Sequence, residues 1–458
     1  MIRIFKDSSS DRESIFSVKE NTPDISIIVS EIIGNVKKNG DKALLYYTEK
    51  FDKVSLSSLK VSEDEIAEAV SSVEPDFLDI LKEAAENIRL FHEKQKREGF
   101  RISKDNENIV VGQKVIPVSV AGIYVPGGTA AYPSTVLMDS IPALVASVPK
   151  IVMVTPPQRN GKVNPTILAA AYISGVSEIY KVGGAQAIAA LAYGTESIPR
   201  ADKIVGPGNA FVAEAKKQVF GDVSIDMIAG PSEILVISDA LSSPSVVASD
   251  MLSQAEHDTL ASAVLITDSE DFAKRVAESL EEQIPLLERK NIARASIDNN
   301  GKIIVTESIE RAIEISNAIA PEHLELCLDN PFDYLDRITN AGSVFLGRYT
   351  PEPIGDYWAG TNHTLPTSGT ARFSSPLSVD DFIKKIQYVY YSKDALGAAA
   401  KKVEYFAKKE SLTAHAKSAV CRFEEQDEWL CKRKNIQNFA LRPGRAAKRQ
   451  KIYKAQYE

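Results

Sequence analysis

The chain has 458 residues, of which 44% are hydrophobic and 25% charged, and its formal net charge is -8. This length exceeds what one hydrophobic core usually holds, so two or more domains are expected. The acidic balance argues against non-specific binding of nucleic acid by the body of the chain. The apolar stretches, such as Ile167–Ile173, are too short to cross a bilayer, and the first residues lack the apolar core of a secretory signal. We therefore expect neither a nucleic-acid partner nor a membrane.

The cysteines are few. Cys327, Cys421 and Cys431 form no CxxC pair and, being three, cannot all be paired. This usage suits a reducing compartment and predicts a cytoplasmic protein. It also disfavours a thiolate zinc site, so any metal must be held mainly by His, Asp, Glu or amide oxygen.

The first third of the chain is predicted to be mainly helical. Apolar residues recur at three- and four-residue spacing over Thr22–Phe51 and Ser62–Lys96, with Thr22-Pro23 and Ser62 as helix starts. His92 lies on the second of these charged segments and is interpreted as a solvated helix residue.

After about Val115, short β-branched runs alternate with Ala-rich helical runs. Strands are predicted at Val118–Val125, Lys150–Thr155, Glu178–Val182 and Lys203–Val205, and helices near Ser134–Ala146, Pro165–Ser174 and Gln186–Ala192. A second such series has strands at Ile234–Asp239, Ser262–Thr267, Lys302–Thr306 and Gly342–Leu346, and helices near Ser245–Glu256, Asp271–Gln283 and Ser308–Ile319. This βαβ rhythm predicts parallel sheets with helices on their faces.

From Val379 the chain is predicted to become helical again, through Ser392–Arg422. The last segment, Glu424–Glu458, begins acidic and ends basic and is interpreted as a loosely attached tail. The predicted fold class is therefore α/β, with two incomplete Rossmann-like domains that contain parallel sheets, plus helical N- and C-terminal segments.

Three glycine-containing turns occupy the first βαβ series. They are Tyr124-Val125-Pro126-Gly127-Gly128, Val182-Gly183-Gly184-Ala185-Gln186 and Val205-Gly206-Pro207-Gly208-Asn209. Each follows a strand and precedes a helix, where backbone amides can meet a phosphate. None is a GxGxxG and no P-loop lysine follows, so glycines that merely make tight turns remain an alternative. Three equivalent turns carrying Tyr124, Gln186 and Asn209 favour a ligand, for which a nucleotide is the natural candidate.

Four histidines have polar neighbourhoods. His257 ends a helix three residues after Gln254, so an imidazole nitrogen and an amide oxygen can approach one cation. The alternative is that His257 is only a polar residue at a helix C-terminus, where the helix dipole favours histidine. The local sequence context alone favours this alternative over a metal ligand. His323 follows Glu322 just before an apolar strand. This pair could act as proton shuttle and general base, or simply cap the turn after Pro321, and both interpretations stay open.

His363 lies in the segment Gly355–Thr367, which has little periodicity but many groups that bind ligands, among them the hard carboxylate oxygen of Asp356. A long structured loop favours function over an ordinary polar surface. His415 follows Glu410 by five residues, so the two would not share one face of a straight helix. Capping by Ser411 or Thr413 is the alternative, and it prevails on local context.

Eight strings, in this order, resemble the histidinol dehydrogenases over about residues 20 to 423. They are Gly183-Gly184-Ala185-Gln186-Ala187-Ile188-Ala189-Ala190-Leu191-Ala192, Gly206-Pro207-Gly208-Asn209-Ala210-Phe211-Val212, Ala229-Gly230-Pro231-Ser232-Glu233, Ser253–His257, Pro321-Glu322-His323-Leu324, Gly355-Asp356-Tyr357, Gly360-Thr361-Asn362-His363 and Leu412-Thr413-Ala414-His415. The family usually ends soon after the region matching Arg422, and the tail resembles nothing that can be assigned.

The resemblance implies a zinc- and NAD-dependent enzyme that oxidises L-histidinol to L-histidine through L-histidinaldehyde, in the last steps of histidine biosynthesis. It places one Zn²⁺ per subunit on Gln254, His257, Asp356 and His415, and the catalytic pair on Glu322 and His323. Substrate contacts are implied at Ser232, His323, His363 and Glu410, besides the four metal ligands. NAD contacts are implied at Tyr124, Gln186 and Asn209.

The resemblance also implies a homodimer whose C-terminal segment reaches into the partner's site, so that Glu410 and His415 serve the neighbouring subunit. The expected organisation is an N-terminal segment at 1–19, a larger α/β domain with most zinc and catalytic residues at 20–123 and 233–378, an NAD-binding domain at 124–232, a helical dimerisation segment at 379–423 and an unassigned tail at 424–458. Three alternatives remain: a zinc hydrolase with Glu322 as base, a related dehydrogenase for another small alcohol, and a non-enzymatic protein whose basic tail binds nucleic acid.

Overall fold

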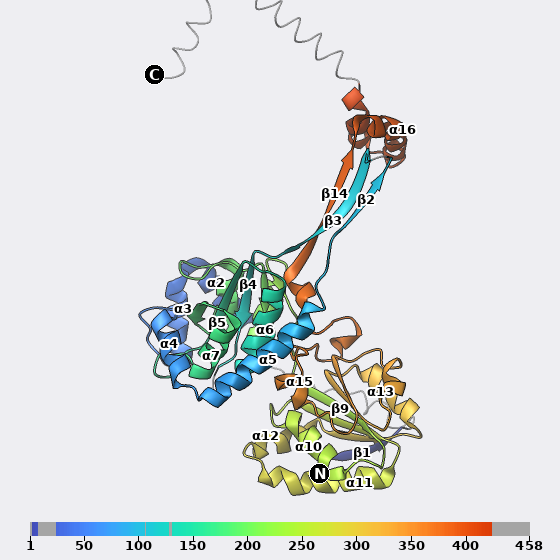
Figure 1. The fold of residues 1–458 in the computed structure, drawn as a ribbon. Helices are drawn as coiled ribbons and strands as arrows, with labels where there is room; N and C mark the ends of the chain where they lie inside the picture. Colours follow the sequence, from blue (N-terminus) through green and yellow to red (C-terminus); the bar gives the residue numbers. More distant parts are fainter. Residues whose placement is uncertain (1, 8–23, 106, 128–130, 424–458) are drawn as a thin grey trace, which may run out of the picture. The chain divides into compact units, whose positions relative to one another are not determined.

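The computed structural model describes residues 2–7, 24–105, 107–127 and 131–423 (Figure 1). These form two compact units. The first contains Met1–Arg97 and Ile116–Lys384, and the second contains Glu98–Val115 and Lys385–Glu458. The first unit holds two parallel sheets and is described first. The tail 424–458 and the predicted helix start Thr22-Pro23 lie outside the described residues.

The first sheet is built by the strands of the first βαβ series. Its order is β6 (Glu178–Lys181), β5 (Lys150–Thr155), β4 (Val120–Tyr124), β7 (Lys203–Val205) and β8 (Ser224–Ile225), and all neighbours are parallel. Between them run α6 (Pro133–Val145), α7 (Pro165–Ser174), α8 (Gly184–Tyr193) and α9 (Ala210–Val219). Counted from β4, this order is 3-2-1-4-5, the order of the first five strands in doubly wound nucleotide-binding sheets.

Local sequence explains why these elements begin and end where they do. Asn164 accepts a hydrogen bond from the Thr166 amide at the start of α7, and Pro165 occupies its first turn, where no amide partner is needed. Gly175 ends the same helix with φ 81°, a conformation that glycine adopts without strain. The strands are buried almost throughout, as expected when helices cover both faces of a parallel sheet.

The N-terminal helical region packs on this same sheet. It comprises α2 (Ser26–Asn39), α3 (Asp41–Tyr47), a π-helical turn η1 (Thr48–Asp52), α4 (Glu63–Ser72) and α5 (Pro75–Glu93). Ser62 caps α4 in a reciprocal capping box with Glu65, which confirms the predicted helix start. Side chains of α2, α4 and α5 join the two hydrophobic clusters around the first sheet. From the sequence we expected residues 20–123 to belong to the same domain as residues 233–378. In the structure, residues 26–93 pack against the strands and helices of the first βαβ series.

The second sheet contains six parallel strands. Its order is β1 (Arg3–Lys6), β11 (Lys302–Val305), β10 (Ser262–Thr267), β9 (Glu233–Ser238), β12 (His323–Cys327) and β13 (Ser343–Leu346). Helices α10 (Pro244–Ala255), α11 (Glu270–Gln283), α12 (Lys290–Asn299) and α13 (Ile309–Ile319) accompany them, with shorter α14 (Phe332–Leu335) and α15 (Pro353–Tyr357). The α/β class with parallel sheets is thereby confirmed, and β1 is an edge strand that the sequence pattern did not predict.

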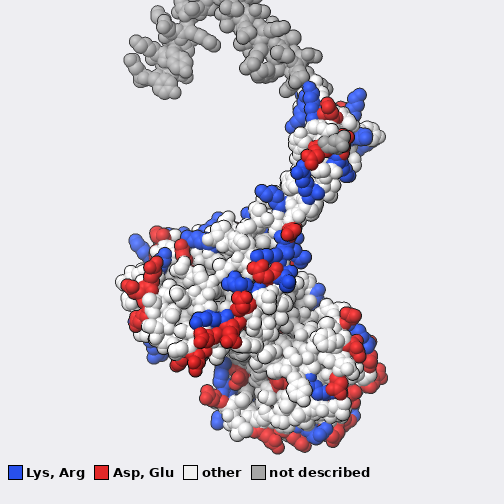
Figure 2. Space-filling model, in the orientation of Figure 1, with Lys and Arg blue, Asp and Glu red and all other residues white. Residues whose placement is uncertain are grey.

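The second unit contains an antiparallel hairpin extended by a third strand. The sheet order is β14 (Ile383–Tyr391), β3 (Ile109–Pro117) and β2 (Phe100–Lys104), followed by α16 (Lys393–Lys409) and a helix over 413–423. The prediction of helix from Val379 onward is wrong over Ile383–Tyr391. That segment is rich in β-branched and aromatic residues, which favour a strand: Ile383, Ile386, Tyr388, Val389, Tyr390 and Tyr391. The visible surface carries acidic and basic side chains interspersed (Figure 2). No helix among the described residues is long and apolar enough to cross a membrane.

Candidate active site

The imidazole of His323 is held in one tautomer at the start of β12. Its Nδ1 lies 2.9 Å from the carbonyl oxygen of Glu233, and because a carbonyl only accepts, Nδ1 carries the hydrogen. Nε2 therefore presents its lone pair, 3.6 Å from Glu352 Oε1 and 4.0 Å from Asp356 Oδ1. Among the described residues Nε2 has no hydrogen-bond partner. Burial lowers the pKa of His323, so at neutral pH the ring is an uncharged base.

Glu322 is buried beside it. Its Oε2 accepts a hydrogen bond from the Glu233 amide at 2.8 Å and lies 3.6 Å from His323 Nδ1. Burial raises the pKa of Glu322 well above its usual value, and the carboxylates of Glu233, Asp356 and Glu352 act in the same direction. Burial also raises the pKa of Glu233 to about 7. A buried carboxyl group whose pKa is raised by its surroundings is a candidate for proton transfer in catalysis.

Asp356 and Glu352 bring two further carboxylates to the same place. An imidazole nitrogen of His323 and one oxygen from each carboxylate all lie within 4.8 Å of one another. Burial, and then the Glu352 carboxylate, raise the pKa of Asp356 to about 9. The close approach of two buried carboxylates is unfavourable unless a proton or a cation lies between them.

Gln254 and His257 come from the C-terminal end of α10. The His257 amide donates to the Gln254 carbonyl at 3.1 Å, so the two residues stay in one turn of the chain. The Gln254 side chain is buried, and its amide nitrogen has no hydrogen-bond partner in the described part of the chain. Desolvation lowers the pKa of His257, and the Glu352 carboxylate opposes that shift, which couples His257 electrostatically to the same cluster.

His363 lies on the loop after α15 and is held from two sides. Its Nδ1 is 3.9 Å from Asp356 Oδ1, and its Nε2 is 3.5 Å from the hydroxyl of Thr135 on α6. Burial, and then the neighbouring His323, lower the pKa of His363 to about 4, so the imidazole is neutral at pH 7. On either side of it, Asn362 donates to the Met138 carbonyl at 2.7 Å and Thr364 donates to Asp139 at 2.9 Å. The loop is therefore fixed to α6.

Ser232 immediately precedes β9, and its carbonyl accepts from the Ser262 amide at 3.0 Å. Nearby, the Gly230 amide donates to the Thr367 hydroxyl at 2.6 Å, and the Ser368 amide donates to Glu233 Oε1 at 3.1 Å. These contacts tie the Ser232 segment to the end of the His363 loop.

The three predicted nucleotide residues lie at the end of a strand of the first sheet or in the turn or helix that follows one. The Tyr124 hydroxyl, at the end of β4, accepts from the Gly184 amide at 3.1 Å, which leaves its own hydrogen to donate. Burial raises the pKa of Tyr124 to about 12. Gln186 is buried in the first turn of α8. Asn209 caps α9, its oxygen accepting from the Phe211 and Val212 amides, so its NH2 group remains a donor. Gly128 of the first glycine turn lies outside the described residues.

A buried ion pair fixes the third glycine turn. Asp226 pairs with Lys216, and its Oδ2 accepts from the Gly206 amide at 2.8 Å. Lys216 also donates to the Gly206 carbonyl at 2.9 Å, so both backbone groups of this glycine are held. Gly206 has φ 119°, and an added Cβ would collide with the Tyr124 carbonyl oxygen. Only glycine fits this position without displacing the strand.

Glu410 and His415 belong to the second unit. Both are exposed, and together with Lys402, Val403, Phe406, Ala407 and Leu412 they line a cavity of about 450 Å³. A largely apolar cavity with two polar ligand-type side chains is suited to covering by another surface. The assignment of these two residues to the zinc and substrate site stays a prediction.

The residues of the first unit fit the divalent metal implied by the resemblance. Three buried polar atoms, His323 Nε2, Glu352 Oε1 and the Gln254 amide nitrogen, have no hydrogen-bond partner among the described residues. Because the oxygen and nitrogen of an amide are assigned from hydrogen bonding, Gln254 can equally present its oxygen. Imidazole, carboxylate and amide groups are the N and O donors that Zn²⁺ accepts.

Two points were missed in the sequence. Glu352, between Pro351 and Pro353, had no periodic or motif signal, although it lies four residues before Asp356. His92 is fully buried rather than solvated: its Nδ1 lies 2.8 Å from the Ile88 carbonyl, and its Nε2 is 3.5 Å from Asn362. Because charged residues flank His92 in the sequence, we predicted a solvated side chain, whereas His92 lies on the buried face of α5.

The two parallel sheets and the buried histidine–carboxylate centre define an α/β enzyme. The sequence profile described as histidinol dehydrogenase matches residues 17–423, and the chain belongs to this family of dehydrogenases. The histidinol dehydrogenase of Clostridium acetobutylicum is 58% identical over 429 residues, covering 93% of this chain and 99% of that protein. That of Listeria innocua is 54% identical, covering 87% and 93%. The crystal structure of histidinol dehydrogenase from Elizabethkingia anophelis, 41% identical, superposes with a TM-score of 0.87 over 93% of this chain and 99% of that chain.

Proposed function

We propose that this chain catalyses the four-electron oxidation of L-histidinol to L-histidine, through L-histidinaldehyde, with NAD and one Zn²⁺ per subunit. The observation that carries the proposal is the fixed tautomer of His323: the Glu233 carbonyl binds Nδ1–H, so the lone pair of Nε2 points into a buried group of carboxylates. The family membership supports the substrate, because the relatives carry the name histidinol dehydrogenase.

In the first oxidation, His323 Nε2 takes the hydroxyl proton of the alcohol as the C–H bond breaks and the aldehyde forms. Glu352 and Asp356 lie within 4.0 Å of Nε2 and stabilise the imidazolium that results. His363 is neutral and can hold a polar group of the substrate by a hydrogen bond, while Thr135 and Asp356 orient its ring.

In the second oxidation, water adds to the aldehyde carbon: Glu322 takes one proton from the water, and the imidazolium of His323 returns its proton to the carbonyl oxygen, giving the hydrate. Loss of hydride from the hydrate carbon, with transfer of a hydroxyl proton to His323, then gives the carboxylic acid, which ionises to the carboxylate of L-histidine. Glu322 lies next to His323 and accepts a hydrogen bond from the Glu233 amide. Glu322 as the base and His323 as the proton acceptor can therefore act at the same carbon atom, and the aldehyde need not leave the site. Retaining the aldehyde is useful because free aldehydes react with amines.

Zn²⁺, when bound by Gln254, His257, Asp356 and His415 of the neighbouring subunit, would orient the imidazole and amino groups of the substrate and polarise its oxygen. NAD, contacted by Tyr124, Gln186 and Asn209, would accept the two hydrides in turn. The homodimer with shared sites belongs to the same proposal and is supported by the exposed cavity around Glu410 and His415. A cytoplasmic location remains the expectation from cysteine usage.

The direct test is the absorbance of NADH after addition of L-histidinol and NAD to the purified chain, with and without a chelator. We expect two NADH per L-histidine formed, and loss of the signal with chelator that Zn²⁺ restores. Absence of NADH in the metal-loaded enzyme contradicts the proposal, and a hydrolase with Glu322 as base would then become the better interpretation. A panel of small alcohols separates L-histidinol from a related substrate.

A further inference from the structure

A glutamate occupies a core position on β12, an inner strand of the second sheet. Leu324 and Leu326 of this strand join the hydrophobic cluster on one face of the sheet. Side chains alternate along a strand, so Glu325 and Cys327 point to the other face, where Cys327 joins the cluster that includes α10. Glu325 is 1% exposed. A carboxyl group in such surroundings is unfavourable unless its oxygens have hydrogen-bond partners.

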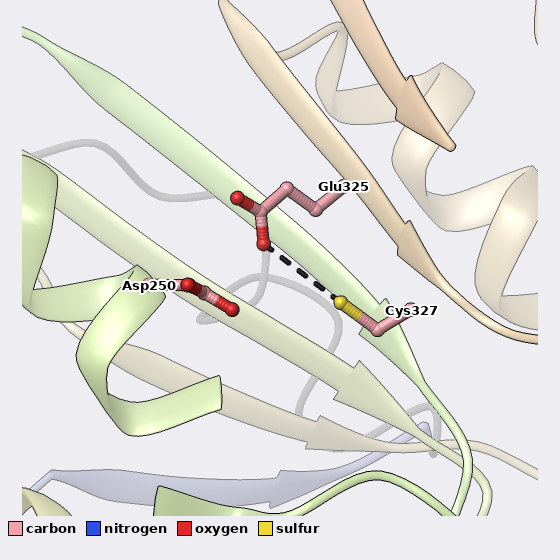
Figure 3. A group of neighbouring side chains, drawn as sticks. All are labelled: Asp250, Glu325 and Cys327. Atoms are coloured by element: carbon pink, nitrogen blue, oxygen red, sulfur yellow. Dashed lines mark hydrogen bonds between the residues drawn. The ribbon is translucent and has the colours of Figure 1, made fainter. Parts of the chain in front are cut away.

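Three groups meet at the Glu325 carboxyl group. The backbone amide of Glu352, directly before α15, donates to its Oε1 at 2.7 Å. The Cys327 thiol donates to its Oε2 at 3.8 Å (Figure 3). The Asp250 carboxyl group of α10 forms a side-chain hydrogen bond with it. Glu325 therefore joins β12 to α10 and to the residue that precedes α15.

The hydrogen bond between Asp250 and Glu325 requires a proton. Ionised carboxylates only accept hydrogen bonds, so one of the two groups must carry a hydrogen. The nearby Arg348 does not replace this proton, because it pairs with Asp239 at 2.9 Å and with Asp329 at 3.1 Å. Burial, and then the Asp250 carboxylate, raise the pKa of Glu325 well above its usual value, which agrees with a shared proton.

The group of Asp250, Glu325 and Cys327 is a support and not a cation site. Both oxygens of Glu325 are engaged, by the Glu352 amide and by the Cys327 thiol. Burial raises the pKa of the thiol, which keeps it from becoming a thiolate ligand.

Glu352 is the residue that this group supports. Its Oε1 lies 3.6 Å from His323 Nε2, where the proposed mechanism places the imidazolium. Its side chain has only a weak contact, from the Ser253 hydroxyl at 3.4 Å, so the backbone anchor on Glu325 largely decides where the carboxylate lies. His323 and Glu325 are two residues apart on one face of β12. One strand thus holds both the catalytic base and the anchor of the carboxylate that faces it.

We propose that Asp250 and Glu325 share one proton and act as a positioning pair, which holds Glu352 against His323 during proton transfer. The shared proton leaves the pair with a single negative charge and joins α10 to β12. The positioning role rests on the proposed function, because it concerns the same reaction. The shared proton does not depend on that function.

The kinetic test removes the anchor. Glu325→Met is similar in size but offers no acceptor to the Glu352 amide, so kcat for L-histidinol oxidation should fall about 10- to 100-fold with little change in KM. Glu325→Gln can accept from that amide through its oxygen and donate to the Asp250 carboxylate through its NH2 group. Its kcat should stay within about threefold of the wild type. An unchanged kcat in Glu325→Met, or an equal loss in both variants, overturns the inference.

The matched control is Ser296→Ala on α12. It removes a buried hydrogen bond, from the Ser296 hydroxyl to the Ala261 carbonyl at 2.8 Å, away from the site. This variant should melt at a lower temperature than the wild type and keep kcat within about twofold. The comparison separates a loss of stability from a loss of positioning.

A double variant tests the route through Glu352. If Glu325 acts through Glu352, then Glu325→Met combined with Glu352→Gln should be no slower than the slower of the two single variants. Losses in kcat that multiply would show that Glu325 acts by another route, and the positioning role would be overturned.

The shared proton is tested without turnover. The infrared difference spectrum between the wild type and Glu325→Gln at pH 7 should contain the C=O band of one protonated carboxyl group, and Asp250→Asn should lose the same band. Absence of this band would show that both carboxylates are ionised, which overturns the inference. If the band is present but the wild-type chain makes no NADH from L-histidinol, the proposed function fails and the shared proton stands.

Discussion

At the scale of single residues, Glu322 and His323 are neighbours in sequence whose surroundings shift their pKa values in opposite directions. His323 is fixed by the Glu233 carbonyl and is neutral because burial lowers its pKa. Glu322 is fixed by the Glu233 amide, and burial raises its pKa. One residue of β9 therefore orients both members of the pair, through its two backbone groups.

The first prediction concerns Glu322→Gln. Because the amide cannot take a proton from water, oxidation of L-histidinaldehyde should fall about 10²- to 10⁴-fold, while oxidation of L-histidinol to the aldehyde is reduced much less. Single-turnover production of NADH from each substrate measures the two steps separately. Equal loss in both steps would contradict the assignment of Glu322 as the base that activates water.

At the scale of secondary-structure elements, α6 connects the His363 loop to the third glycine turn. Thr135 and Asp139, one helical turn apart, contact His363 and Thr364, and Asp139 lies beside the Lys216–Asp226 pair. Burial, and then the Asp226 carboxylate, raise the pKa of Asp139 to about 8. Asp139 is therefore protonated at neutral pH, and one lysine balances one carboxylate in the buried group.

The second prediction follows from this balance. Lys216→Met should destabilise the fold by about 3–5 kcal/mol, because it leaves Asp226 as an unpaired buried charge. Asp139→Asn, which imitates the protonated acid, should cost less than about 1.5 kcal/mol at pH 7. Urea unfolding followed by circular dichroism gives both values. A loss in Asp139→Asn as large as that in Lys216→Met would mean that Asp139 is ionised in the folded protein.

The third prediction concerns pH and the buried His92 of α5. Burial lowers the pKa of His92 in the folded state, so below its usual value of 6.5 the unfolded chain binds more protons than the folded one. Stability should therefore fall as the pH drops below about 6.5. The melting temperature of the metal-free protein, measured between pH 7.5 and 5.5, should decline less steeply in His92→Gln. Parallel pH profiles would show that His92 does not titrate on unfolding.

At the scale of the whole molecule, the residues of the proposed site are divided between the two compact units. Gln254, His257 and Asp356 belong to the first compact unit, and His415 belongs to the second. A dimer in which each C-terminal segment serves the partner subunit would combine them, as symmetric dimers do when they share sites.

The fourth prediction tests this sharing. His257→Ala and His415→Ala should each be inactive, yet a mixture of the two, unfolded and refolded together, should recover about 25% of wild-type activity. Random pairing makes about half of the dimers mixed, and each mixed dimer has one intact site of two. Absence of recovery, with mixed dimers demonstrated by mass spectrometry, would show that His415 acts in its own chain or outside the site.

Much of the fold could be predicted because the spacing of apolar residues along the chain indicates which side of a helix or strand is buried. Three strands and one helix have the predicted bounds, among them Lys150–Thr155 and Pro165–Ser174, and most others differ by one or two residues. The β14 strand was predicted as helix because its apolar residues do not alternate regularly with polar ones, so no period of two marks it as a strand. The edge strand β1 depends on pairing with β11, almost 300 residues away, which no local pattern reveals.

The sequence by itself determined the α/β class, the positions of the glycine turns and, through long matching strings, the family and its implied site residues. Periodicity and motif strings are local, and so they can be read along the chain. Only the tertiary structure decided which polar groups meet: that the Glu233 backbone fixes Glu322 and His323, that Glu352 faces them with an unpaired oxygen, and that His92 is buried. Protonation and ligand geometry depend on burial and on distances between residues remote in sequence, and folding alone sets these.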